Sequence, residues 1–224
     1  MSNNDNTARK PEKTRIMMVD DHPLMREGMA RFLNLQEDLD LCCDAGSVEE
    51  ALVAVAECNP ALAIIDISLH DESGLDLIKT LRRRYPALAL LAMSMHDESV
   101  FAERALRAGA NGYLMKKEAT GNILLAVRRV LAGDIYLSAA MHSQLSQRLL
   151  APQAGAPGPI AGLSEREFEI LHLLGLGFGT RQIADKLSRS IKTVEAHRAS
   201  LKDKLQLKSG ADLVRFAIQW LEDR

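Results

Sequence analysis

Three carboxylates, one hydroxyl and one ammonium group stand at the ends of short apolar runs in the sequence. Asp20 and Asp21 follow "IMMV", and Asp66 follows "LAII". Ser94 ends "LLAMS", and Lys116 ends "GYLMK". Carboxylates that lie close together repel one another unless a cation lies among them, and oxygen ligands suit Mg²⁺. A carboxylate can also form an acyl phosphate as a nucleophile, while a metal ion, an ammonium and a hydroxyl bind the phosphoryl oxygens.

The elements that would bring these side chains together alternate along the first part of the chain. Strand-like apolar runs are each followed by a helical segment, five times in about 120 residues. This alternation predicts an α/β, doubly wound, five-stranded parallel sheet of the flavodoxin-like type, with right-handed crossovers. In the flavodoxin-like strand order, 2-1-3-4-5, the first and third strands are neighbours. The carboxylates would therefore meet at the carboxyl edge of the sheet.

The 224 residues suffice for two domains. We expect a disordered polar arm at 1–13 and the α/β domain at 14–135. A linker at 136–160 would begin as a helix and continue through the Pro/Gly/Ala-rich stretch "APQAGAPGPIAG". A second, small all-α domain of four helices would occupy 161–224, because nothing in that range has the pattern of a strand.

The second domain contains two helical segments in the arrangement of a helix-turn-helix, "TRQIADKL" and "RSIKTVEAHRASLKDKL". The chain has a net charge of -2, but residues 181–208 carry eight Lys or Arg against three Asp or Glu. This local excess of basic residues favours a nucleic-acid partner. Helical periodicity points Val194, Leu201 and Leu205 inward. The predicted DNA-binding residues are Lys192, Thr193, Glu195, Ala196, Arg198, Ala199, Lys204 and Lys208.

Two further patterns concern assembly and compartment. The last helix, 210–221, has Leu213, Phe216 and Trp220 along one stripe, which makes it a candidate dimer surface. The three cysteines, 42, 43 and 58, form no CxxC pattern, so we interpret them as reduced, buried small apolar side chains. No apolar run approaches the ~18 residues of a membrane span, and the N-terminus has no apolar core of a signal peptide. These features favour a cytoplasmic protein.

Residues ~14–135 resemble a receiver domain of bacterial two-component signalling, in "VDDH", in Asp66 after an apolar run, in "GLDLI", in Ser94 and in "AGANGYLMK". Residues ~161–222 resemble the LuxR-type helix-turn-helix of NarL/FixJ response regulators, in "LSEREFEIL", "IADKL", "KTVEAHRASLKDKL" and "LKSGADLVRFAI". The resemblance implies a phosphorylation-dependent, DNA-binding transcriptional regulator. Its partners would be a sensor histidine kinase, double-stranded promoter DNA and a second copy of the chain.

The resemblance also implies roles for individual residues. Asp66 would accept a phosphoryl group from the kinase. Asp21, Asp66 and the Ser68 carbonyl would bind Mg²⁺ directly, while Asp20 would act mainly through water. Lys116 would bind the phosphoryl group, and Ser94 and Tyr113 take the places of the family's switch pair. His70 and Lys117 stand where the family commonly has proline.

In the LuxR-type family, two positions just after "TV" and one three residues further on face the bases. Here these positions are Glu195, Ala196 and Ala199. Glutamate can accept a hydrogen bond from the cytosine amine, and alanine can contact the thymine methyl group. We therefore hypothesise a preference for such bases.

Two alternative functions and two modes of activation remain open at the level of sequence. A phosphatase or phosphotransferase with an Asp nucleophile also pairs carboxylates with Mg²⁺, but it usually carries the nucleophile in a DxD pattern on the first strand. An adaptor that works without phosphorylation would not need the five-residue site. We expect a regulator that catalyses only its own phosphorylation and dephosphorylation. Its linker permits either release of the DNA-binding domain or dimerisation.

Overall fold

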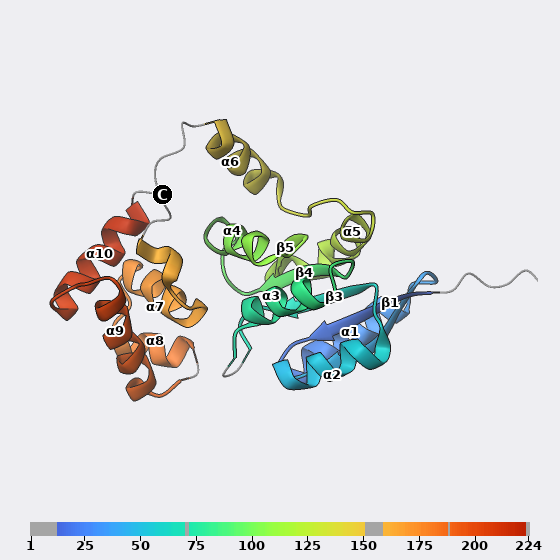
Figure 1. The fold of residues 1–224 in the computed structure, drawn as a ribbon, viewed down its shortest axis with the longest axis horizontal. Helices are drawn as coiled ribbons and strands as arrows, with labels where there is room; N and C mark the ends of the chain where they lie inside the picture. Colours follow the sequence, from blue (N-terminus) through green and yellow to red (C-terminus); the bar gives the residue numbers. More distant parts are fainter. Residues whose placement is uncertain (1–12, 70–71, 151–158, 188, 223–224) are drawn as a thin grey trace, which may run out of the picture. The chain divides into compact units, whose positions relative to one another are not determined.

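The computed structural model describes residues 13–69, 72–150, 159–187 and 189–222 (Figure 1). The chain divides into two compact units, Met1–Ala151 and Pro152–Arg224. Residues 1–12 of the predicted arm and residues 151–158 of the Pro/Gly/Ala-rich stretch lie outside the described residues. The helix predicted before that stretch is α6, Ala139–Leu150. No helix in the described ranges is long and apolar enough to cross a membrane.

The first unit is built on a five-stranded parallel sheet with the order β2-β1-β3-β4-β5, which confirms the predicted flavodoxin-like topology (Figure 1). Every strand is short, and the inner strands β3 and β4 are almost wholly buried, as expected of a parallel sheet covered on both faces, while the edge strand β2 is partly exposed. The strands are β1 Thr14–Val19, β2 Leu39–Ala45, β3 Leu62–Asp66, β4 Ala89–Ser94 and β5 Gly112–Met115.

Helices cover both faces of this sheet. Helices α1 (Pro23–Asn34) and α5 (Ala119–Leu131) pack on one face, where Met29, Leu33 and Ile123 join alternate strand residues in one core. Helices α2 (Val48–Cys58), α3 (Gly74–Arg84) and α4 (Glu98–Ala108) belong to the other layer, with α3 between α2 and α4. A short 3-10 helix, η1 (Lys116–Glu118), joins β5 to α5. No peptide bond among the described residues is cis.

Local sequence explains where these helices begin. The side chains of Ser47, Ser73 and Asp97 accept hydrogen bonds from backbone N–H groups in the first turns of α2, α3 and α4. These caps satisfy donors that have no partner inside the helix, and each contributes about 1 kcal/mol. Ser47 and Glu50 form only part of a capping box, because the Glu50 side chain accepts from Gly46 N–H instead of from the N-cap residue. At the other end of α4, Gly109 takes a φ of 110°, which favours glycine.

The pairing of β1 with β2 contains an irregularity at the adjacent cysteines. Ile16 pairs with Leu41 but Met17 pairs with Cys43, so Cys42 is an extra residue in β2. The prediction that all three cysteines are fully buried is wrong, because each is partly exposed. A regular strand would have alternated its side chains strictly between the two faces, and the bulge breaks that alternation.

The second unit is helical throughout its described elements, as predicted. After a 3-10 turn, η2 (Pro159–Gly162), come α7 (Glu165–Gly175), α8 (Thr180–Lys186), α9 (Ile191–Lys204) and α10 (Gly210–Glu222). Helix α7 packs against α9 and α10, and α8 packs against α9. Val194 and Leu201 are buried as predicted, while Leu205 is only partly buried.

The role of the last helix as a dimer surface stays a prediction, and part of its apolar stripe packs inside its own domain. Leu213 is fully buried, and the Trp220 ring lies edge-on to Phe168 of α7, with ring centroids 5.3 Å apart. The apolar stripe of α10 therefore belongs to the core of its own domain. The outer side of α10 presents Ile218, a single exposed apolar residue.

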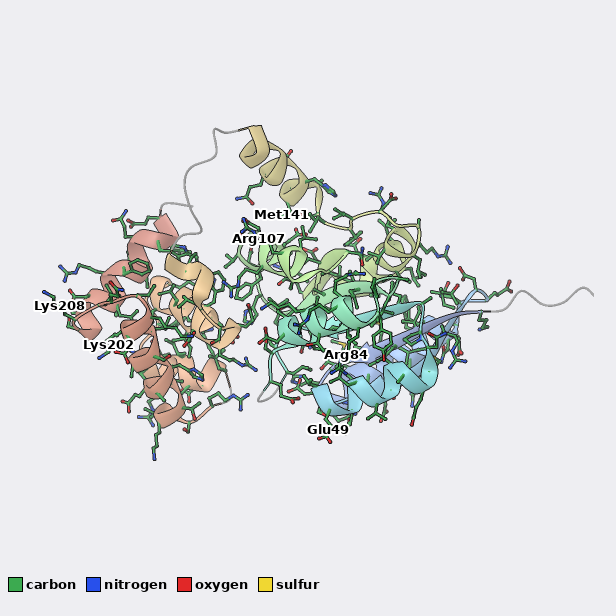
Figure 2. The ribbon with its side chains drawn as sticks, viewed as in Figure 1. Glu49, Arg84, Arg107, Met141, Lys202 and Lys208 are labelled. Carbon is green, nitrogen blue, oxygen red and sulfur yellow. The ribbon has the colours of Figure 1, made fainter. Side chains whose placement is uncertain are left out.

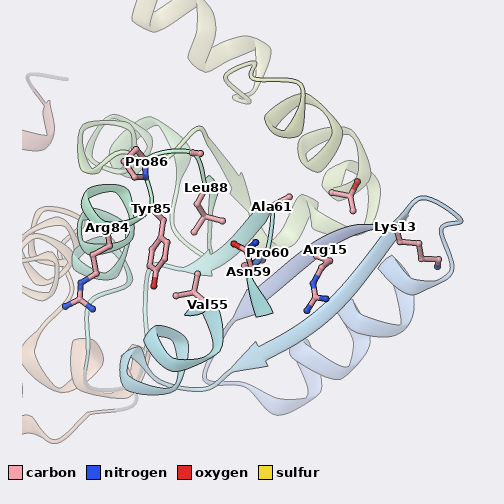
Figure 3. A pocket seen from close by; sticks show the side chains of 12 residues that line it. Lys13, Arg15, Val55, Asn59, Pro60, Ala61, Arg84, Tyr85, Pro86 and Leu88 are labelled. Carbon is pink, nitrogen blue, oxygen red and sulfur yellow. The ribbon is translucent and has the colours of Figure 1, made fainter. Parts of the chain in front are cut away.

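A cavity of about 690 Å³ opens at the amino-terminal edge of the sheet (Figure 3). Arg15 at the start of β1, Asn59 before β3 and Arg84 before β4 contribute to its lining. This edge is opposite the one at which the candidate carboxylates stand, so the cavity is separate from the site described next.

Candidate functional site

The three predicted carboxylates converge at the carboxyl edge of the sheet. Asp20 and Asp21 follow β1, Asp66 ends β3, and these two strands pair directly. One ligand atom from each of these carboxylates and one from His22 all lie within 4.8 Å of one another. Asp20 is fully buried and Asp66 is 2% exposed. This arrangement is the acidic cluster that the strand order predicted.

Lys116 supplies the positive charge inside this cluster. Lys116 directly follows β5, at the same edge of the sheet. Its Nζ lies 2.7 Å from Oδ2 of Asp20 and 2.8 Å from Oδ2 of Asp66. Burial raises the pKa of Asp66, and the ion pair with Lys116 opposes that rise. Burial alone would lower the pKa of Lys116, but Asp66 and Asp20 outweigh it and raise that pKa, so the side chain is an ammonium ion.

The phosphoacceptor candidate also receives a backbone donor. Ser68 N–H donates to Oδ1 of Asp66 at 3.0 Å, which places Ser68 beside the carboxylate as predicted. Gly74 makes this loop possible, because a Cβ on it would lie 1.9 Å from the backbone O of Asp66. In the sequence Gly74 is only the first residue of "GLDLI", and its role depends on a close approach of two backbones that the sequence does not reveal.

The switch pair is connected through His96. Ser94 is fully buried, and its Oγ accepts a hydrogen bond from His96 N–H at 3.0 Å. The Tyr113 hydroxyl donates to the backbone O of His96 at 3.0 Å, and burial raises the Tyr113 pKa. The His96 ring stacks on Phe101 of α4 and lies 3.1 Å, through Nε2, from Oγ of Ser68. His96 is therefore a residue of the site that the sequence pattern did not indicate.

His22 was expected only at the start of the first helix, and it does stand at the N-cap of α1. Its backbone N–H donates to Oδ1 of Asp20 at 2.9 Å. Its Nδ1 also lies 3.0 Å from that oxygen and 2.8 Å from Oδ1 of Asp21. His22 therefore holds the two carboxylates in place from the solvent side, where 69% of its side chain is exposed.

The donor atoms of the cluster fit a hard divalent cation. Three carboxylates supply oxygen ligands within one small volume, and such oxygens suit Mg²⁺. Both oxygens of Asp20 are engaged, one by His22 and the other by Lys116. Asp21 is more accessible, with 17% of its side chain exposed. Asp21 and Asp66 are therefore better placed than Asp20 for direct metal contact.

The predicted DNA-binding residues fall into two groups. Most are exposed on α9 or just after it: Lys192, Thr193, Glu195, Ala196, Ala199 and Lys208. Figure 2 shows the neighbouring Lys202 on α9 and Lys208 beyond its end.

Arg198 and Lys204 form the second group, because both make contacts inside their own domain. Arg198 Nη1 donates to Oγ1 of Thr180 at 2.5 Å, and Lys204 Nζ donates to Oε2 of Glu167 at 2.7 Å. Burial would raise the pKa of Glu167, but hydrogen bonds from Lys204, Ser200 and Ser164 outweigh it and lower the pKa to about 2. These two cations help to hold α8, α9 and α7 together.

A doubly wound sheet with this acidic edge, followed by a helix-turn-helix unit, defines a receiver joined to a DNA-binding domain. Comparison with protein families agrees. Residues 16–128 match the model described as "Response regulator receiver domain", and residues 161–217 match "Bacterial regulatory proteins, luxR family". The chain therefore belongs to the bacterial two-component response regulators of the NarL/FixJ type, which are DNA-binding transcription regulators.

Curated relatives cover nearly the whole chain. The chain is 43% identical over 204 residues to "Transcriptional activator protein ExaE" of Pseudomonas putida. The aligned region spans 91% of this chain and 95% of the relative. It is 35% identical over 210 residues to "Oxygen regulatory protein NreC" of Staphylococcus haemolyticus, over 92% of this chain and 97% of the relative.

Solved structures share the fold. A LuxR-family two-component response regulator from Aurantimonas sp. SI85-9A1 is 29% identical, with a TM-score of 0.57 over 62% of this chain and 99% of that one. RcsB from Salmonella enterica serovar Typhimurium, bound to promoter rprA in the presence of the phosphomimetic BeF3-, is 24% identical. Its TM-score is 0.56 over 92% of this chain and 98% of that one, and at this identity it shows the fold alone.

Proposed function

We propose that Asp66 is the phosphoacceptor and that a sensor histidine kinase is the donor. The observation that carries this proposal is the position of Lys116 Nζ, 2.8 Å from Asp66 Oδ2 and 2.7 Å from Asp20 Oδ2. A buried carboxylate with an ammonium on one oxygen and the Ser68 N–H on the other is held in one orientation. These are the groups that would bind the oxygens of an incoming phosphoryl group.

In the proposed reaction an Asp66 oxygen attacks phosphorus of the kinase's phosphohistidine. A P–O bond forms as the P–N bond breaks, and the leaving imidazole nitrogen keeps the electron pair and is protonated. Lys116 would neutralise one phosphoryl oxygen, and Ser94 on the neighbouring strand would donate its hydroxyl hydrogen to another. Hydrolysis of the acyl phosphate returns Asp66, so the chain would catalyse only its own phosphorylation and dephosphorylation.

Mg²⁺ is the proposed cofactor, with Asp21, Asp66 and the Ser68 carbonyl as protein ligands and Asp20 acting through water. The ion would supply positive charge to the phosphoryl oxygens during transfer. Within the chain, His22 and Lys116 would keep Asp20 fixed beside it, because they engage its two oxygens. The proposed domain limits are an arm at 1–13, the receiver at 14–135, a linker at 136–160 and the DNA-binding domain at 161–224.

We propose that phosphorylation acts on the DNA-binding domain through the segment after α5. The support lies in how that segment attaches to the switch. Tyr113 N–H donates to the Tyr136 carbonyl at 2.9 Å, and Ser138 N–H donates to Oε1 of the buried Glu98 at 2.8 Å. Met141, at the start of α6, is 2% exposed (Figure 2). A change at Tyr113 would thus reach the linker within one hydrogen bond, whether activation works by release or by dimerisation.

The proposed partner of the second domain is double-stranded promoter DNA, and the proposed compartment is the cytoplasm, where such DNA lies. Helix α9 would lie in the major groove, with Glu195, Ala196 and Ala199 toward the bases. Lys192 and Lys208 would contact phosphates, and Thr193 would lie beside them. Arg198 and Lys204 would support the orientation of α9 instead. Because two-fold dimers match inverted repeats in DNA, a homodimer is the proposed binding form.

The proposal is tested by incubating the full chain with a small phosphodonor and Mg²⁺ and measuring acid-labile phosphate. The wild-type chain should take up one equivalent and Asp66→Asn should take up none. Asp76→Asn is the matched control, since Asp76 is an exposed carboxylate on α3 paired with Lys79, and it should label as the wild type does. Labelling of Asp66→Asn to the wild-type extent would show that the assigned phosphoacceptor is wrong.

A further inference from the structure

The chain's three cysteines, far from the phosphoacceptor function, gather in one place. Cys42 and Cys43 lie on β2, and Cys58 is the last residue of α2. Their three sulfur atoms all lie within 4.8 Å of one another. They are all the cysteines that the sequence has. A cluster that uses every thiol of the chain is a potential binding site for a soft ligand.

The bulge in β2 creates this cluster. Successive side chains of a regular strand point to opposite faces, so adjacent cysteines would be separated by the sheet. Because Cys42 is the extra residue of the bulge, its sulfur lies 3.8 Å from that of Cys43. The Cys43 sulfur is in turn 4.0 Å from the carbonyl oxygen of Ala54 on α2. The Cys43 thiol therefore faces α2, where Cys58 completes the set, while the Cys42 thiol donates to the backbone O of Ile16 on β1 at 3.4 Å.

The surroundings favour metal binding over a disulfide. Cys42 and Cys43 are adjacent, so their Cα atoms are about 3.8 Å apart, closer than the ~4.4–6.8 Å usual for a disulfide. A disulfide from either of them to Cys58 would leave the third thiol out, whereas a metal ion that displaces the thiol protons can bind all three sulfurs. All three cysteines are partly exposed, which leaves an entry path for an ion.

The number of ligands and the local charge narrow down the ion. Among the described residues the group contains three sulfurs and neither a histidine nor a carboxylate. Zn²⁺ also binds thiolates but usually has four ligands, one more than the cluster supplies, and Cu(I) is another soft ion that thiolates select. Three thiolates around a monovalent ion leave a net charge of about −2. Arg15, which lines the cavity in Figure 3 and interacts electrostatically with Cys42 and Cys58, offsets part of that charge.

We propose that Cys42, Cys43 and Cys58 form a three-coordinate thiolate site for a soft monovalent ion, Cu(I). Binding releases three protons, one from each thiol, and three Cu–S bonds form. No electron is transferred, because the ion is already in its reduced state. The site lies on the edge of the receiver formed by β2 and α2 and does not depend on the phosphorylation proposal.

The test uses the reduced full-length chain without oxygen, titrated with Cu(I) in competition with a coloured Cu(I) chelator. One equivalent should bind, with the ultraviolet absorption of Cu(I)–thiolate bonds and an X-ray absorption spectrum that fits three sulfur neighbours. Each single variant, Cys42→Ser, Cys43→Ser and Cys58→Ser, should lose more affinity than the roughly 10–100-fold typical of an outer-shell partner. Far-ultraviolet circular dichroism checks that each variant is folded.

Met95→Leu is the matched control, because it removes a soft sulfur ligand that is 69% exposed outside the cluster. It should bind Cu(I) as the wild type does. If the folded Cys58→Ser variant kept the wild-type affinity, or if the wild type bound no Cu(I) against the chelator, the site would be refuted. Binding of Zn²⁺ in preference to Cu(I), measured in a direct competition, would refute the assigned ion.

Discussion

Glu167 links two helices of the DNA-binding domain, and its replacement should destabilise that domain in a pH-dependent way. Its carboxylate accepts hydrogen bonds from Ser164 N–H at the start of α7 and from Ser200 and Lys204 on α9, at 2.6 to 2.7 Å. The Glu167 side chain is only 5% exposed. Glu167→Gln keeps the shape of the side chain but removes the charge that these donors stabilise.

The magnitude follows from the pKa. Hydrogen bonds lower the pKa of Glu167 from 4.5 to about 2, and a shift of this size corresponds to about 3 kcal/mol at neutral pH. The Lys204 side chain is 43% exposed, so solvent screens its contribution to this stabilisation. We therefore expect Glu167→Gln to lower the free energy of unfolding by about 2 kcal/mol at neutral pH. Because the folded pKa is depressed, the contribution is complete above pH 4.5. It is lost as the pH falls toward 2, and at pH 3 it has fallen by more than half.

The assay is urea unfolding of the full chain followed by the fluorescence of Trp220. This is the chain's single tryptophan, and it packs on Phe168 of α7, so it reports the second domain alone. Wild type and Glu167→Gln are compared at pH 7 and pH 3, with Glu222→Gln, an exposed position near the end of α10, as the control. Two results would refute the reasoning: a decrease of the free energy of unfolding in Glu167→Gln of under about 0.5 kcal/mol at pH 7, or a decrease at pH 3 as large as that at pH 7.

Three further predictions concern the two sites. Gly74→Ala should destabilise the receiver by about 3 kcal/mol, since its Cβ would meet backbone atoms, as measured by urea unfolding with circular dichroism. Asp21→Asn should weaken Mg²⁺ binding about tenfold more than Asp20→Asn in a titration, because both oxygens of Asp20 are already engaged. Glu195→Lys should change the preferred DNA sequence in a binding-site selection, because lysine donates hydrogen bonds where glutamate accepts them.

Each of these predictions has a control or a contradicting result. Gly28→Ala, in α1 with open space around its Cβ, should stabilise the chain by about 0.5–1 kcal/mol. If Gly74→Ala were equally harmless, the close backbone approach would not matter. The reverse order of Mg²⁺ affinities would exchange the roles of Asp20 and Asp21. An unchanged selection with Glu195→Lys would remove Glu195 from the base-contacting face.

Much of the candidate site could be predicted because a parallel sheet brings its strand ends together. The apolar runs before Asp66 and Ser94 predict buried parallel strands, and this is enough to place both residues at the carboxyl edge of the sheet. The contacts of His96 with Ser68 and Tyr113 could not be predicted, because they join two loops to β5, and the conformations of those loops depend on tertiary packing. The bulge at Cys42 is equally hidden, since strand pairing rather than the sequence of β2 alone sets the register.

The apolar stripe of α10 shows why periodicity could not separate core from interface. A stripe at helical spacing indicates only that one face of the helix is covered. Whether the cover comes from the same chain or from a second copy depends on the neighbouring helices. Leu213 and Trp220 are covered by their own domain, through α7 and α9.

The charge pattern of α9 has the same limit, and here the consequence is functional. Lys192 and Lys204 look equivalent in a count of basic residues, but Lys204 faces a buried glutamate that lies 37 positions away in the sequence. A cation held by a buried carboxylate has lost part of the charge that attracts phosphate. The electrostatic footprint on DNA is therefore smaller than the basic excess of residues 181–208 suggests, and the salt dependence of binding should reflect only the remaining cations.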